Sequence, residues 1–148
     1  MKKVLSLLLV VIALLSFASC LPKNKVDEKG KITVVIMEES PLVYEVKLDD
    51  LDMKEGALSV VKYLNTEKGV ALEYQDSTYG AYLTKLGNIS TDKAGYLSVF
   101  TSVESDWDVS SYCVTKEYEG VTVKTSGVGV SGMSVVDGMI LYFCYIAY

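Results

Sequence analysis

Residues 139–147, MILYFCYIA, are apolar at nearly every position. A strand with one face in water alternates apolar and polar residues, whereas a strand buried on both faces does not. Ile and aromatic residues dominate this run, and these residue types favour a strand. We therefore expect residues 139–147 to form a central strand of a sheet.

A hairpin is predicted much earlier in the chain. Residues 31–37 (KITVVIM) are rich in β-branched side chains, and residues 42–48 (LVYEVKL) form a second strand-like run. The intervening residues 38–41 (EESP) are typical of a turn. Two strands joined by so short a turn are expected to pair antiparallel.

One helix follows the hairpin. Asp52 is a good N-cap, and Glu55 three residues later completes a capping-box pattern. Asn65 and Gly69 suit the end of the helix. Four apolar residues between these ends follow the spacing i, i+3, i+4, i+7, which predicts a single buried stripe: Ala57, Val60, Val61 and Leu64.

The rest of the chain is predicted to be strands and turns. Strand-like runs at 70–74, 81–86, 96–103, 111–115 and 121–125 alternate with turns rich in Gly, Asn and Asp. Two strands, one helix and then further strands indicate an α+β domain. We expect residues 31–148 to form a single β-grasp-like domain, a mixed sheet with one main helix.

The first twenty residues predict export. Lys2 and Lys3 precede an uncharged run from Val4 to Phe17, and small residues stand just before Cys20. This pattern is typical of a secretory signal peptide, and a run of about 14 residues is shorter than the roughly 20 of a spanning helix. The cysteine at the cleavage position resembles a bacterial lipobox.

We accordingly predict a lipoprotein signal peptide at 1–19 and a lipidated tether at 20–30. The lipid on Cys20 would hold the domain on the outer face of a cell membrane, of Gram-positive type. The alternative is an ordinary signal peptide cut near Ala18 or Ser19, which would leave a free cysteine.

The composition excludes several classes of function. The chain has no Arg and a net charge of −5, which argues against nucleic-acid binding because that depends on cationic contacts to phosphate. The chain also has no His, which removes Ser-His-Asp catalysis and His-based zinc sites. Ser59 and Lys62 fit S-x-x-K, but no S-D-N accompanies them. We therefore predict no enzymatic activity and no cofactor.

Two further patterns concern metals and disulfides. Glu104, Asp106 and Asp108 alternate, but the spacing and glycine of an EF-hand are missing, so no metal site is predicted. Cys113 and Cys144 remain if Cys20 is acylated. Outside the cell they could pair as a disulfide or stay as two buried thiols, and the sequence leaves both readings open.

Aromatic residues are the main positive signal for binding. Tyr and Trp provide large amphipathic contact areas at low entropic cost. Several of them fall on successive loops and strand ends after the helix, although each one taken alone is expected to fill a sheet face. The candidate ligand-binding residues are Tyr79, Tyr82, Tyr96, Phe100, Trp107 and Tyr112.

Five segments resemble a known family in their order and spacing: residues 55–64, 82–89, 95–102, 126–129 and 136–148. The chain is similar to bacterial extracellular domains of unknown function related to the C-terminal β-domain of transcobalamin and intrinsic factor. Leu97 stands where the family often has Trp. The resemblance implies a β-grasp-like fold without catalysis. In the animal carriers this domain is one of two that enclose cobalamin, and we do not expect this chain alone to enclose it.

Two functions follow as hypotheses. The first is a membrane-anchored binding module for a small ligand, such as a corrinoid or another planar molecule. The second is a structural or adhesive module that binds a surface protein or glycan, with an open sheet edge able to accept a strand.

Overall fold

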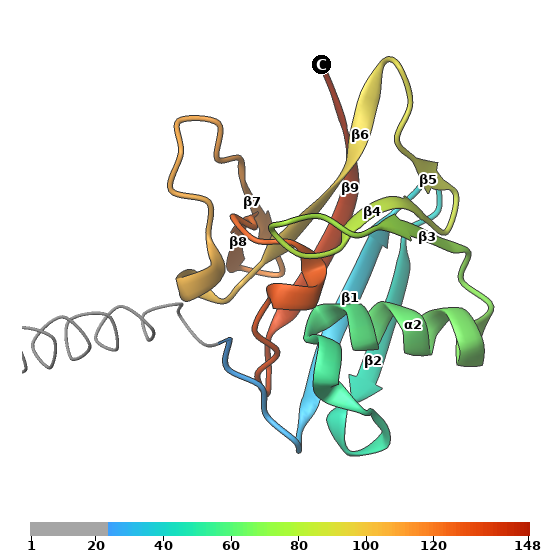
Figure 1. Cartoon of the computed structure of the whole chain (residues 1–148), viewed down its shortest axis with the longest axis vertical. Helices are drawn as coiled ribbons and strands as arrows, with labels where there is room; N and C mark the ends of the chain where they lie inside the picture. Colours follow the sequence, from blue (N-terminus) through green and yellow to red (C-terminus); the bar gives the residue numbers. More distant parts are fainter. Residues whose placement is uncertain (1–23) are drawn as a thin grey trace, which may run out of the picture.

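The computed structural model describes residues 24–148, which are drawn in colour in Figure 1. The predicted signal peptide 1–19 and the lipid attachment site Cys20 lie outside the described residues. Within residues 24–148, no helix is both long and apolar enough to cross a bilayer.

A six-stranded mixed sheet forms the centre of the molecule (Figure 1). Its strands, in the order β2-β1-β9-β6-β8-β7, are β2 (Leu42–Lys47), β1 (Lys31–Met37), β9 (Ile140–Ala147), β6 (Gly95–Thr101), β8 (Val121–Thr125) and β7 (Thr115–Tyr118). β1 and β9 are parallel, and the other neighbours are antiparallel. The predicted hairpin and the central position of the last strand are confirmed.

Residues 140–144 of β9 are buried on both faces, which explains the unbroken apolar sequence there. Leu141 and Phe143 point into the larger core, beside the helix. Ile140, Tyr142 and Cys144 point into a smaller core on the opposite face. Successive side chains of a strand alternate between the faces of its sheet, so two cores require apolar residues at successive positions.

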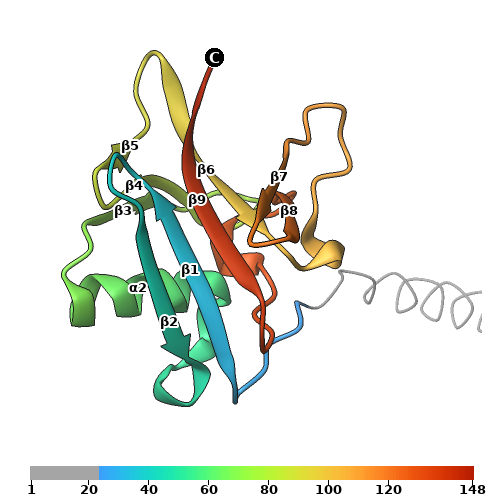
Figure 2. The same ribbon diagram turned by 180° about the vertical axis from the view of Figure 1, so that it is seen from behind.

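The larger core lies under helix α2 (Ala57–Lys68) and a small second sheet (Figures 1 and 2). That sheet has the order β3-β4-β5, with β3 (Leu72–Gln75), β4 (Tyr82–Leu86) and β5 (Ile89–Ser90). The predicted stripe is correct, because all four of its members are fully buried: Ala57, Val60, Val61 and Leu64.

The helix begins later than the capping-box pattern predicted. Asp52 precedes a 3₁₀ turn, η2 (Met53–Glu55), and Gly56 is the N-cap of α2. Gly56 has a φ of 51°, and a Cβ at this position would lie 2.5 Å from the carbonyl oxygen of Met133. The chain turns sharply at this glycine, so the helix cannot extend back to Asp52.

The smaller core is covered by the β7–β8 hairpin. Tyr118 of β7 packs against Tyr142 of β9, with ring centroids 6.1 Å apart. Lys116 Nζ lies 5.8 Å from the centroid of the Phe100 ring. Of the predicted strand 111–115 only Thr115 is in a strand, β7 occupies 115–118, and β5 was not predicted. β5 and β7 have only two and four residues, too few to show a clear strand pattern in the sequence.

The segment predicted as a free tether is partly docked on the domain. Val26 forms a parallel bridge with Val135. The Asp27 amide donates to the Val135 carbonyl at 2.8 Å, and the Val135 amide donates to the Lys25 carbonyl at 2.8 Å. The domain as described therefore includes residues before Lys31.

Asp106 is the main buried anion, and it joins two distant segments. It ends the short 3₁₀ helix η3 (Glu104–Asp106) and is 8% exposed. Its carboxylate accepts hydrogen bonds from the Ser134 amide at 2.6 Å and from the Ser134 hydroxyl at 3.1 Å. Charged acceptors bound to amides make strong hydrogen bonds, so Asp106 holds the 133–135 segment against η3.

Replacing Asp106 by Ala should destabilise the protein by about 1–3 kcal/mol, because the Ser134 amide would be left buried without an acceptor. Glu104→Ala is the matched control, since Glu104 is an exposed acid in the same 3₁₀ helix. It should change stability by less than about 0.5 kcal/mol. Urea unfolding measures both, and equal losses in the two variants would contradict a specific role for Asp106.

Candidate ligand-binding groove

A groove of about 440 Å³ lies where β4, β6 and the segment 126–130 meet. We call it the tyrosine groove, after three tyrosines on its walls. The turn between β3 and β4 contributes to its lining. Its lining residues are Gln75–Ser77, Tyr79–Leu83, Tyr96–Val99 and Ser126–Val130.

The groove opens because β6 has only part of its second edge paired. β6 pairs with β9 over its whole length, but it pairs with β8 only at Phe100 and Thr101. At the end of β8 the Ser126 amide donates to the Val99 carbonyl at 3.0 Å. The next amide, of Gly127, donates instead to the Asp106 carbonyl at 2.9 Å. The chain thus leaves β6 at this point.

Gly80 and Gly129 are in close backbone contact within the lining of the groove. The Gly129 amide donates to the Tyr79 carbonyl at 2.7 Å, and the Val130 amide donates to the Ala81 carbonyl at 2.9 Å. A Cβ on Gly129 would lie 2.6 Å from the carbonyl carbon of Gly80. Glycine is therefore required at position 129, because a side chain there would clash with the backbone of Gly80.

The groove brings together three of the six predicted aromatic residues. Tyr79 is 82% exposed on the β3–β4 turn, and Tyr82 is 43% exposed at the start of β4. Tyr96 is half-buried on β6, and its ring lies 5.7 Å from that of Tyr148. The three tyrosines line the groove together with aliphatic residues, such as Leu83 and Leu97, and with glycines and serines.

A hydrogen-bonded turn holds the start of β6, next to Tyr96. One oxygen of Asp92 accepts from the Ala94 amide at 2.8 Å, the Gly95 amide at 3.0 Å and the Tyr145 hydroxyl at 2.6 Å. The hydrogen bond from Tyr145 is the main cause that lowers the pKa of Asp92. The same bond raises the pKa of Tyr145 to about 12.

The chemistry of the lining suits binding. Asp76 is the only charged residue among the residues that line the groove. The remaining polar groups are serine hydroxyls, tyrosine hydroxyls, the Gln75 amide and backbone groups. A mostly apolar groove with a few polar groups and a single charged residue is typical of small-molecule sites.

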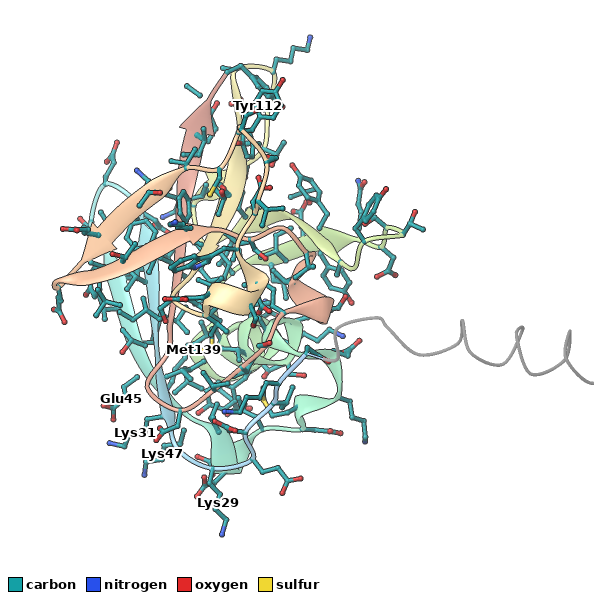
Figure 3. All side chains as sticks on the ribbon, turned by 90° about the vertical axis from the view of Figure 1, so that its left-hand side faces the viewer. Lys29, Lys31, Glu45, Lys47, Tyr112 and Met139 are labelled. Atoms are coloured by element: carbon teal, nitrogen blue, oxygen red, sulfur yellow. The ribbon has the colours of Figure 1, made fainter. Side chains whose placement is uncertain are left out.

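The other three predicted aromatic residues lie elsewhere. Phe100 is fully buried in the smaller core, because its side chain points to the face opposite Val99. Trp107 donates from Nε1 to the Thr101 carbonyl at 2.8 Å, and Lys124 Nζ lies 4.3 Å from its ring centroid. Tyr112 is 86% exposed and lies at the opposite end of the molecule from Lys31 and Glu45 (Figure 3).

The remaining sequence motifs are separate from the groove. Cys113 and Cys144 are both free in the structure, where Cys113 is half-buried and Cys144 is buried in the smaller core. Ser59 is buried, and its Oγ accepts from the Glu55 amide at 3.2 Å. The pKa of Lys62 is raised, chiefly by its hydrogen bond to Glu55, which favours the charged ammonium over a catalytic base.

The acidic run around η3 does not form a metal cluster. Asp106 turns inward to Ser134, whereas Asp108 accepts from the Ser110 amide at 2.8 Å. Over the range 24–148, no group of three or more Cys, Asp or Glu residues is placed to hold a metal ion.

Comparison with known proteins shows similarity at the level of fold. No protein-family model and no curated protein matches the sequence. Haptocorrin in complex with Cbi aligns with 90% of this chain and 28% of its own, at a TM-score of 0.56 and 12% identity. A candidate metal-binding protein from Ruminococcus gnavus ATCC 29149 aligns with 82% of this chain and 99% of its own, at a TM-score of 0.48 and 13% identity. The chain thus shares its fold with about a quarter of haptocorrin.

Replacing Tyr145 by Phe should raise the pKa of Asp92, because it removes the hydrogen bond that most favours the ionised carboxylate. The pKa of Asp92 is lower in the folded protein than in the unfolded chain. The ionised carboxylate therefore stabilises the fold at any pH above the pKa of an unfolded-chain Asp. This stabilisation is lost as the pH falls through the lowered value. An NMR titration of the Asp92 carboxyl carbon in both proteins measures the shift, with Tyr148→Phe as the control. An unchanged pKa in Tyr145→Phe would contradict this assignment.

Proposed function

We propose that the protein is a non-catalytic binding module whose tyrosine groove holds part of a small, flat ligand. The observation that carries this proposal is the meeting of Tyr79, Tyr82 and Tyr96 around one nearly uncharged groove. A corrinoid is the first ligand to test, because the fold is also found in haptocorrin, which was crystallised with Cbi.

The size of the groove limits how such a ligand would bind. Sites for small molecules usually span about 300–1,000 Å³, and the groove measures about 440 Å³. A groove of this size would hold one edge of a corrinoid and leave the rest exposed. Full enclosure would need a second surface, so we expect binding by this chain alone to be weak.

The lack of catalysis is also part of the proposal. A catalytic nucleophile needs a base within hydrogen-bond reach. No lysine lines the groove. The hydroxyls of Ser77 and Ser126 donate to backbone carbonyls, of Gly80 and Val128, and not to the one carboxylate of the lining, Asp76. The S-x-x-K serine, Ser59, is buried at the helix and accepts a backbone hydrogen bond. Both observations favour binding over hydrolysis.

We further propose that the domain is a lipoprotein, anchored through Cys20 on the outer face of a cell membrane. Support comes from the sequence of residues 1–20. A diacylglyceryl anchor would hold firmly, since two acyl chains bind a bilayer far more strongly than one. We also propose that the domain is related to the transcobalamin-like family and that its fold is β-grasp-like.

The alternative function is the binding of a surface protein or glycan. The specific observation in its favour is that Tyr79 and Tyr112 are 82% and 86% exposed. Exposed tyrosines are common in surfaces that bind macromolecules.

Titration of the purified protein with cobinamide tests the small-ligand proposal. Tyr82→Ala should weaken binding about tenfold, the effect expected when an aromatic contact of about 1.4 kcal/mol is lost. Tyr112→Ala is the matched control, because Tyr112 is an exposed tyrosine outside the groove. The affinity is measured by calorimetry and by the rise in melting temperature. The proposal is wrong if cobinamide fails to bind, or if Tyr112→Ala weakens binding as much as Tyr82→Ala.

A further inference from the structure

Two unpaired backbone groups face the tyrosine groove from β6. The N–H and C=O of one residue in an antiparallel ladder point to the same neighbouring strand, and successive residues alternate. The Leu97 amide donates to Thr91 Oγ1 at 3.1 Å, and the Val99 carbonyl accepts from the Ser126 amide at 3.0 Å. Both residues therefore point away from β9, toward the groove.

The Leu97 carbonyl, an acceptor, and the Val99 amide, a donor, have no hydrogen-bond partner in the described part of the chain. β8 would have to continue alongside β6 to pair with them, but its pairing with β6 stops at Thr125. The open groove thus contains a short free strand edge.

We propose that this edge binds an extended peptide segment of a partner protein, which adds to the sheet as a strand beside Leu97–Val99. An extended peptide carries an amide donor and a carbonyl acceptor on the same edge, so it can meet both free groups, in either chain direction. Side chains of the added segment would lie against Tyr82 and Tyr96, which also line the groove.

Electrostatics narrows the class of peptide. Asp76 is the only charged residue on the lining, and the whole chain has a net charge of −5. An acidic segment would be repelled on approach. The segment is therefore neutral where it contacts the groove, or carries a basic residue near Asp76.

The inference goes beyond the small-ligand proposal, although it uses the same groove. A flat ring needs the tyrosine surfaces, whereas an added strand needs the Leu97 carbonyl and the Val99 amide. An experiment can therefore contradict one proposal without contradicting the other.

A random heptapeptide phage library, selected against the purified protein, supplies the probe. We expect selected peptides to be depleted in Asp and Glu. Val99→Pro removes the free amide and should weaken binding of the synthetic peptide at least tenfold. Proline is tolerated on a strand where its missing N–H is not part of a ladder. Val99→Ala, the matched control, shortens the same side chain and keeps the amide, so it should bind within about threefold of the parent.

N-methylation of the selected peptide gives a test that leaves the protein unchanged. Strand addition predicts at least a tenfold loss at a position whose N–H faces β6 and little loss at its neighbours. The inference is overturned if no peptide is selected, if Val99→Pro binds like Val99→Ala, or if N-methylation at every position is tolerated. Cobinamide, titrated into the same preparation, reports separately on the small-ligand proposal.

Discussion

The burial of β9 on both faces is the constraint on which the rest of the structure depends. Its parallel pairing with β1 joins the first strand of the domain to the last. Its antiparallel pairing with β6 fixes the middle of the sheet. Leu141 and Phe143 anchor the core under the helix, while Tyr142 anchors the core under the β7–β8 hairpin. Both layers therefore pack against the same strand, and truncating any buried side chain of residues 140–144 would weaken one core or the other.

The groove exists because the two edges of β6 are paired to different extents. One edge of β6 is fully paired with β9, whereas the other is paired with β8 for two residues and is then left open. Gly129 packs against Gly80 across this opening and brings Tyr79 and Tyr82 to its rim. The aromatic surface and the free backbone groups thus have the same structural cause: after β8 the chain leaves β6 at Ser126. Both binding proposals depend on this feature of the sheet topology.

The sequence predicted those strands and the helix face whose residues show a clear local pattern, and it missed features that depend on distant contacts. The local residue pattern located β1, β8, the helix stripe and the central β9. It failed at the start of the helix, where contact between Gly56 and Met133 decides the backbone path. It also failed for Phe100, because alternation along a strand does not show which face a distant hairpin will cover. Three groove tyrosines were predicted, but the glycine contact that assembles them joins residues about fifty positions apart.

Amide hydrogen exchange along β6 tests the central claim most directly. Ser98 and Phe100 pair with β9, and Thr101 is paired with β8, so their amides should exchange slowly, at rates set by opening of the sheet. The Val99 amide lies between them on the same strand and should exchange at least a hundredfold faster (on the order of 3 kcal/mol less protection). That result would establish the open edge in solution. Protection of Val99 equal to that of Phe100 would mean that the edge is closed, and the account of the groove would be wrong.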